Sequence, residues 1–241
     1  MDENFIGHYM PCHRFYLPLS LDPQTEVYLE GTELHHLAHV MRVREGEEVE
    51  LINGKGVLAQ AKLIRLDKKK ALFTIEKVFK IPAPTPQILL GVPLLRPSKL
   101  EWIVEKGTEL GVDSFLFYPS ELGEKKGLSA HQLERLESLL ISATKQSGRL
   151  FLPHIEILSS FQDLFKKEVF IYFGDTKTSC SFEATNFPVL FITGPESGFS
   201  KQEYQVLQQQ AQGVKLNEYV LRAETAPLTA ASILAWKKCI P

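Results

Sequence analysis

A glycine-rich turn, FITGPESGFSKQE at residues 191 to 203, has the residue types of a ligand-binding loop. Its two glycines allow backbone N–H groups to approach a ligand closely, because they carry no side chain. Glu196 between them repels phosphate groups and favours neutral or cationic ones. Ser200 and Glu203 have the spacing of a capping box, which predicts a helix directly after the turn. The turn therefore suits a neutral or cationic ligand, although a purely structural strand-to-helix turn would use the same residues.

Three common loops of nucleotide-binding and acyl-transfer proteins do not match this turn. The phosphate loop requires a lysine after its second glycine, where Phe199 stands. A nucleophile elbow requires a central serine, but Glu196 occupies that position and Ser197 comes one place too late. The dinucleotide-binding pattern G-x-G-x-x-G is also missing.

A second polar loop follows in VKLNEYVLRAETAPLTAASILAW. A brief apolar segment at 214 to 216 leads into a loop that contains Asn217, Arg222 and Glu224, and Thr225 and Pro227 are typical of a helix start. We expect this loop to lie beside the glycine-rich turn. The alternative is that Arg222 and Glu224 form only a surface ion pair.

The elements that must position these loops alternate between strands and helices after residue 87. Short, continuous apolar runs between amphipathic helices predict strands that are covered on both faces, and hence a parallel α/β sheet. Ligands of such sheets bind at the carboxyl ends of the strands. The expected strands are at 87–95, 114–119, 169–174 and 188–193, and the expected helices at 98–111 and 129–148.

The chain before residue 81 has a different pattern. Apolar and polar residues alternate between residues 48 and 79, with breaks at Asn53-Gly54 and around Asp67, which predicts short antiparallel strands in a small β-barrel or sandwich. A short helix is expected to open at Thr32 and Glu33. The prolines of KIPAPTPQ predict a linker. We therefore divide the chain into 1–80, a linker at 81–87, and 88–241.

The short helix carries His35, His36 and His39, of which a pair four residues apart could share a metal ion. The glutamate of the H-E-x-x-H pattern is missing and no third ligand is obvious nearby. We therefore favour a solvated or RNA-facing helix, and we expect no metal.

Net charge is −2, so nucleic-acid binding would require a local basic patch. One candidate, which could also be an ordinary solvated strand edge, comprises Lys62, Arg65, Lys68, Lys69, Lys70, Lys77 and Lys80. Cys12, Cys180 and Cys239 are far apart and are expected to be free thiols. The start of the chain has no signal-peptide pattern, and no apolar run is as long as a membrane span, so we expect a cytoplasmic protein.

Five motifs in the same order resemble the SPOUT-class 16S ribosomal RNA uridine-N3 methyltransferases of the RsmE type. They are HHLAHVMRVREGEEV with LINGKG, KLEWIVEKGTELGV, KQSGR at 145 to 149, ITGPESGFSKQE, and LNEYVLRAETAPLTAASIL. The resemblance implies a PUA-like RNA-binding β-domain, a SPOUT α/β domain with a trefoil knot, and a homodimer. It also implies S-adenosylmethionine as the methyl donor and 16S ribosomal RNA in the small ribosomal subunit as the substrate.

Carried over by position, the resemblance assigns two walls of a donor site. The first contains Thr193, Gly194, Pro195, Glu196 and Gly198, and the second contains Leu216, Asn217 and Leu221. It also matches Arg149, Arg222 and Glu224 to polar positions that approach substrate or donor in the family. Our own hypothesis gives catalytic roles to Arg222, Glu224 and Glu196. Arg222 would stabilise negative charge on the uracil oxygens, and the two glutamates are possible bases. RNA contacts are expected at Arg42, Arg44, Lys68, Lys69, Lys70 and Arg149.

The chain departs from the family pattern at Ser197, Asn217 and Tyr219, where a glycine, a glycine and an arginine are usual. Two other readings therefore stay open. One is an RNA-binding module without catalysis, and the other is a methyltransferase of the same class that acts on tRNA or on another ribosomal site.

Overall fold

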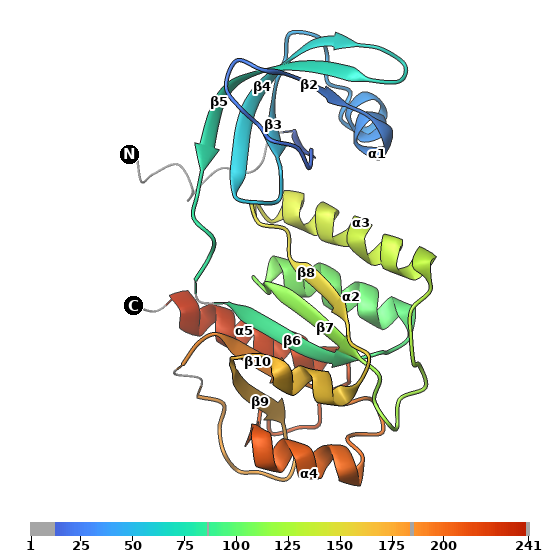
Figure 1. The fold of residues 1–241 in the computed structure, drawn as a ribbon, viewed down its shortest axis with the longest axis vertical. Coiled ribbons are helices and arrows are strands. Elements are labelled where there is room, and N and C mark those ends of the chain that lie inside the picture. Colours follow the sequence, from blue (N-terminus) through green and yellow to red (C-terminus); the bar gives the residue numbers. More distant parts are fainter. Residues whose placement is uncertain (1–12, 86, 184–185, 240–241) are drawn as a thin grey trace. The chain divides into compact units, whose positions relative to one another are not determined.

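The computed structural model describes residues 13–85, 87–183 and 186–239. The chain divides into two compact units (Figure 1). The first comprises residues 1–83 and 144–152, and the second comprises 84–143 and 153–241. The segment 144–152 thus belongs with the N-terminal strands, although the contiguous division at 81–87 places it in the C-terminal part.

The first unit contains one five-stranded sheet in the order β1-β3-β4-β5-β2. Its strands are β1 (Arg14–Tyr16), β2 (Glu26–Leu29), β3 (Glu48–Ile52), β4 (Val57–Leu66) and β5 (Ala71–Lys80). The predicted antiparallel pairing is confirmed for β2 to β5, whereas β1 pairs with β3 in parallel. The described strands form a single sheet rather than the two facing sheets of a sandwich.

The predicted breaks between strands are confirmed. Asn53 Oδ1 accepts hydrogen bonds from Lys55 N (2.8 Å) and Val57 N (3.2 Å), and Gly54 has a φ of +72°, which favours glycine. Asp67 N donates to Lys70 O (2.9 Å) at the β4–β5 turn.

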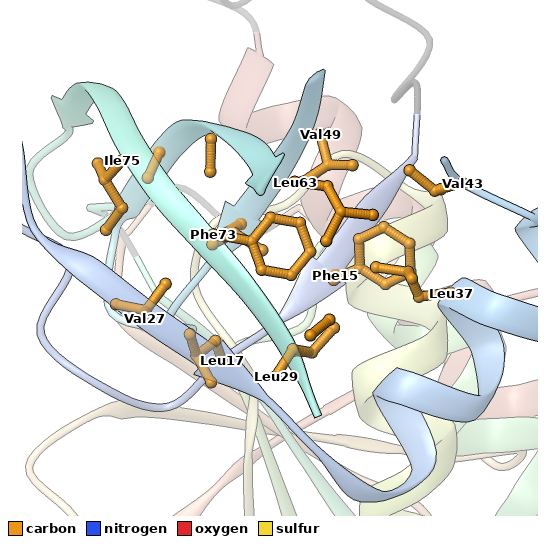
Figure 2. Packing of buried hydrophobic residues seen from close by; sticks show 14 of the residues in the cluster. Phe15, Leu17, Val27, Leu29, Leu37, Val43, Val49, Leu63, Phe73 and Ile75 are labelled. Carbon is orange, nitrogen blue, oxygen red and sulfur yellow. The ribbon is translucent and has the colours of Figure 1, made fainter. Parts of the chain in front are cut away.

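The core of the first unit is an apolar cluster between the sheet and a short helix. Figure 2 shows Phe15, Leu37, Leu63 and Phe73 in this cluster, all of them fully buried. Leu37 belongs to the helical segment, which consists of α1 (Gly31–His35) and a π-helical turn, η2 (His36–Met41).

The predicted opening of this helix is wrong in one detail. The helix begins at Gly31, and no side chain caps its first residues. Glu33 instead accepts a hydrogen bond from Tyr16 N (2.8 Å) and forms an ion pair with Lys145 (2.6 Å). The glutamate therefore joins three segments of the first unit.

The second unit contains the predicted parallel sheet, with six strands in the order β11-β9-β10-β6-β7-β8. The strands are β6 (Ile88–Pro93), β7 (Ser114–Tyr118), β8 (His154–Ile157), β9 (Phe170–Gly174), β10 (Val189–Ile192) and β11 (Gln212–Val214). The edge strand β8 was not predicted, because HIEI is short and only partly apolar.

Helices cover both faces of this sheet. They are α2 (Pro97–Glu109), α3 (Ala130–Gln146), the 3-10 helix η3 (Phe161–Lys166), α4 (Lys201–Gln210) and α5 (Thr225–Cys239). On one face, α5 packs against α2, β6 and β10. On the other, Phe161 of η3 and Leu207 of α4 share a buried cluster with Leu190 of β10. The predicted buried face of α2 is confirmed at Leu100, Ile103, Val104 and Gly107.

The strand order reverses at β6 and β10, the two central strands. From β6 the chain continues to β7 and β8 on one side, and from β9 onward it builds the other side. Ligands of doubly wound sheets bind where the order reverses, at the carboxyl ends of the strands. No helix within the described residues is long and apolar enough to cross a membrane.

Candidate functional site

A cavity of about 1050 Å³ lies at the carboxyl ends of β9, β10 and β11. This volume is slightly above the usual range for small-molecule sites, roughly 300–1,000 Å³. All of its lining residues belong to the second unit: Lys99, 174–177, 193–201, Tyr204, Gln205, Gln208, 214–217, 219–223 and Ala226.

The structure brings most of the predicted site residues to this cavity. The lining includes the eight residues assigned to the donor walls, namely Thr193, Gly194, Pro195, Glu196, Gly198, Leu216, Asn217 and Leu221. Arg222 also lines it, whereas Glu224 does not but forms ion pairs with two lining residues, Lys99 and Arg222. The expected RNA contacts at Arg42, Arg44, Lys68, Lys69, Lys70 and Arg149 belong to the first unit.

The first wall of the cavity is the turn after β10. Gly198 N donates to Pro195 O (2.9 Å), and Gly198 has a φ of +77°, a conformation that favours glycine. A Cβ at Gly194 would lie 3.4 Å from the ring of Phe199, in van der Waals contact with it. Tyr118 donates from its hydroxyl to Thr193 O (2.6 Å) beneath the turn, and burial raises the pKa of this hydroxyl well above its usual value.

The predicted capping box at the end of the first wall is confirmed. Ser200 N donates to Glu203 Oε2 (2.9 Å), and Glu203 N donates to Ser200 Oγ (3.1 Å). The buried Glu203 carboxylate also accepts from Glu121 N (2.8 Å). The cap therefore fixes both the start of α4 and the loop after β7.

The second wall follows β11. Lys215 N donates to Cys180 O (2.7 Å), and Asn217 Oδ1 accepts from Tyr219 N (3.1 Å) in a local turn. Tyr219 and Val220 are exposed, at 77% and 82%. This wall thus combines an ordered start with an exposed apolar tip.

A cluster of charges lies where β6 and β10 end. Lys99 Nζ is 2.7 Å from Glu196 Oε1 and 2.9 Å from Glu224 Oε2. Glu224 Oε1 is in turn 3.9 Å from Arg222 Nη1. Lys99 was not among the predicted site residues.

The ion pairs of this cluster change the pKa values of its members. The hydrogen bond from Lys99 lowers the pKa of Glu196. Burial acts to raise the pKa of Glu224, but Lys99 and Arg222 reverse that effect and the net shift is downward. The hydrogen bond to Glu196 and the ion pair with Glu224 raise the pKa of Lys99. All three groups are therefore charged near neutral pH.

Tyr204 of α4 also lines the cavity, together with Asp175 and Lys177. Its hydroxyl donates to Asp175 Oδ2 (2.9 Å), and Lys177 Nζ lies 4.3 Å from the centroid of its ring. Sequence reasoning missed these three residues, because they match no motif and meet only through the packing of α4 beside β9.

The basic residues of the first unit gather around the β4–β5 turn. Lys68 and Lys69 are exposed there, and Lys70 Nζ lies 4.3 Å from the centroid of the Tyr28 ring. Leu66 N donates to Glu45 Oε1 (2.8 Å), which brings the segment at 42–47 beside this turn. Arg42 and Arg44 are both exposed within that segment.

The histidines and cysteines take different positions. His36 packs against Phe15 (ring centroids 5.8 Å apart), and burial lowers its pKa, whereas His35 and His39 pack against each other (4.7 Å). Within the described ranges, no group of three or more potential metal ligands is found. Cys180 is a free, exposed thiol. Cys12 and the side chain of Cys239 lie outside the described residues.

Comparison with known protein families gives two matches. An RNA methyltransferase domain matches residues 82–235, and an RNA methyltransferase PUA domain matches residues 29–76. A curated relative, the ribosomal RNA small subunit methyltransferase E of Bacillus subtilis, is 30% identical over 231 residues. The alignment covers 87% of this chain and 89% of that protein.

Solved structures with the same fold cover nearly the whole chain. A ribosomal RNA small subunit methyltransferase E from Neisseria gonorrhoeae, bound to S-adenosylmethionine, superposes with a TM-score of 0.85 at 29% identity and covers 95% of this chain and 98% of its own. A probable rRNA methyltransferase from Porphyromonas gingivalis has a TM-score of 0.83 at 27% identity, with coverage of 94% and 98%.

Proposed function

The chain belongs to the RNA methyltransferase family, and from that premise we propose that it transfers a methyl group from S-adenosylmethionine to N3 of a uridine in 16S ribosomal RNA. The main support is the cavity after β10, which the two predicted loops line in a fold shared with a relative that binds this donor. The enzyme is accordingly an S-adenosylmethionine-dependent ribosomal RNA methyltransferase.

The cavity residues suit the chemistry of the donor. S-adenosylmethionine, when bound, supplies a methyl group on a positively charged sulfur atom. The glycines of the first wall leave backbone groups accessible, and the Glu196 carboxylate beside them is ionised, which favours a cation. We assign Thr193, Gly194, Pro195, Glu196, Gly198, Leu216, Asn217 and Leu221 to donor binding.

Arg222 is the residue that we assign to charge stabilisation on the substrate. Methylation at N3 requires loss of the N3 proton, which leaves negative charge on the uracil oxygens. The Arg222 side chain is 86% exposed at the cavity, so its guanidinium is available to a base that enters from solvent. Its positive charge lowers the cost of deprotonation.

Glu196 and Glu224 have a different role in this proposal. An efficient general base has a pKa near the working pH, but the pKa values of both carboxyl groups are lowered. They are therefore weak proton acceptors, and we assign them to the placement of charge around the donor, while solvent water accepts the N3 proton.

The first unit is proposed to bind the RNA backbone. Its match to a PUA domain and the exposed cations around the β4–β5 turn support this role. The proposed contacts are Arg42, Arg44, Lys68, Lys69, Lys70 and Arg149. The relevant substrate is 16S ribosomal RNA within the small subunit, which implies a cytoplasmic site of action.

We also propose a homodimer and a trefoil knot in the second unit. Exposed Trp102, Trp236, Tyr219 and Val220 give the second unit apolar surface that a partner copy would cover. The knot would involve the two cavity loops, at 193–200 and 215–224. Sedimentation of the purified protein tests the dimer directly.

The function is tested with labelled S-adenosylmethionine and small ribosomal subunits that lack the modification. The RNA is digested after incubation and its nucleosides are separated. Label in 3-methyluridine is the expected result. If the label appeared only in tRNA, or in a nucleoside other than 3-methyluridine, the proposed substrate or product would be wrong. No transfer beside an active control enzyme would favour an RNA-binding module without catalysis.

A further inference from the structure

Lys99 is a cation at a helix position that usually favours an acidic residue. It stands in the first turn of α2, two residues after Pro97, and this turn contains no acidic residue. The positive end of the helix dipole lies there, so a carboxylate is favoured and a cation is disfavoured. A lysine at this position needs compensation from elsewhere in the fold.

The compensation comes from both sides of the cavity. Glu196 belongs to the turn after β10, and Glu224 immediately precedes α5, at the end of the second wall. Lys99 Nζ contacts one carboxylate oxygen of each, at 2.7 and 2.9 Å. Segments that are distant in the sequence thus meet at a single ammonium group.

Burial distinguishes this cluster from a surface ion pair. The side chains of Lys99 and Glu224 are 26% and 18% exposed. Exposed pairs contribute little, because water and salt screen them, but a pair that is mostly shielded keeps more of its attraction. The contact with Glu224 is therefore the shielded one, whereas the Glu196 side chain is 51% exposed and its contact with Lys99 is shielded on the lysine side only.

We propose that Lys99 is a positioning residue for methyl transfer, whose ammonium group ties the two walls of the donor cavity together through Glu196 and Glu224. This inference rests on the proposed function. Lys99 sets the width of the cavity between the turn at 193–200 and the segment that ends at Glu224. It also keeps both carboxylates ionised beside the place where the cationic donor binds.

The same helix offers a matched control. Lys106 Nζ also contacts two carboxylates, those of Glu105 and Glu109, at 2.8 Å each, and its side chain is 30% exposed. Both of its partners lie on α2 itself. Removal of Lys106 thus deletes the same kind of cluster without releasing a cavity wall.

The test compares Lys99→Met, Lys99→Arg and Lys106→Met with the unchanged protein. S-adenosylmethionine is titrated into each by calorimetry between about pH 4 and 8, a range that includes the usual glutamate pKa. We expect Lys99→Met to bind the donor about tenfold more weakly near neutral pH, as for loss of one charge-assisted hydrogen bond. Loss of the cation also raises the pKa values of Glu196 and Glu224, so the decline of affinity in acid begins at a higher pH.

Lys99→Arg should restore most of the affinity, because a cation of similar reach remains. Lys106→Met should bind like the unchanged protein. Equal donor affinity and equal pH dependence in Lys99→Met and Lys106→Met would overturn the inference. Should Lys99→Met fail to fold in a thermal melt, Glu224→Gln removes one contact from the other side, and unchanged donor affinity in that variant would be equally decisive.

These outcomes remain separate from the proposed function. If the unchanged protein does not bind S-adenosylmethionine, the proposed function fails. If it binds the donor and Lys99→Met binds equally well, only the role of Lys99 fails.

Discussion

The two units place their shielded ion pairs in contrasting surroundings. In the first unit, Arg14 and Glu50 are 6% and 11% exposed, and Lys145 and Glu33 are 13% and 17% exposed. These pairs join β1 to β3, and α1 to the segment 144–152. In the second unit, Lys99 and its partners stand beside a cavity of about 1050 Å³, and Glu196 is 51% exposed.

This difference separates two uses of charge. An enclosed pair cannot meet a ligand, so its contacts only fix which segments are neighbours. A pair at a cavity wall fixes neighbours and also presents charge to whatever enters. The first kind should therefore affect stability alone, and the second should affect binding and turnover.

The largest expected effect is on the enclosed pair. Glu50→Gln leaves the buried guanidinium of Arg14 without its counter-ion, and we expect the free energy of unfolding to fall by about 3–5 kcal/mol. Urea unfolding measures it. Asp67→Asn is the control, because the Arg65–Asp67 pair is about half exposed, and its loss should cost less than about 1 kcal/mol. Similar losses in the two variants would erase the distinction between enclosed and open pairs.

Arg222→Ala tests whether a charged residue at the cavity wall affects turnover. We expect kcat to fall by about 10²–10³, because a cation that stabilises developing charge is lost, with little change in donor affinity. Single-turnover kinetics and donor titration measure the two quantities. Arg135→Ala removes an exposed arginine that is paired on the surface with Glu101, and it should leave both unchanged. Equal loss of turnover and donor affinity in Arg222→Ala would reject the assigned role.

The exposed cations of the first unit should contribute to RNA affinity but not to donor affinity. Reversal of Lys68, Lys69 and Lys70 to glutamate should reduce the slope of log affinity against log salt by about two to three, with no change in donor affinity. Filter binding at several salt concentrations measures this slope. Lys125→Glu with Lys166→Glu, two exposed lysines of the second unit, provides the control. An unaltered slope in the triple variant would remove this patch from the RNA interface.

The smallest expected effect is the response of the unchanged protein to pH. The pKa values of Glu196 and Glu224 are lowered, so both carboxylates stay ionised at and above the usual pKa of a glutamate. Their contribution to donor binding is lost only when the pH falls through these lowered pKa values. Donor affinity should therefore stay constant from about pH 6 to 7, a window that lies below the usual pKa of the donor's own α-amino group. A decline in donor affinity within that pH window would show that donor binding depends on a protein group whose pKa is higher than those of the two glutamates.

Much of the fold could be predicted because its signals are local. Continuous apolar runs indicated the parallel strands, and the residues at 53–54 and 67 indicated the turns of the first sheet. The parallel partnership of β1 with β3 could not be predicted, because no local pattern records which distant strand pairs with Arg14–Tyr16. The half-buried β8 and the short η3 lacked a periodic apolar signal.

The candidate site divides in the same way. The two loops were predicted from their glycines, caps and polar residues, and both line the cavity. Lys99 was missed because its role depends on two carboxylates that only the folded sheet brings together. The only local sequence feature that marks Lys99 is its position in the first turn of a helix, where no acidic residue accompanies it.

The hydroxyl of Tyr118 gives the protein a built-in spectroscopic probe. It donates to Thr193 O (2.6 Å), and burial keeps its pKa well above the usual value, so the phenol does not titrate under conditions in which the protein functions. Its ring resonances in NMR spectra are thus free of changes caused by its own deprotonation. Any displacement of the turn at Thr193 would change the surroundings of this ring, so its NMR resonances report on the turn without an added label.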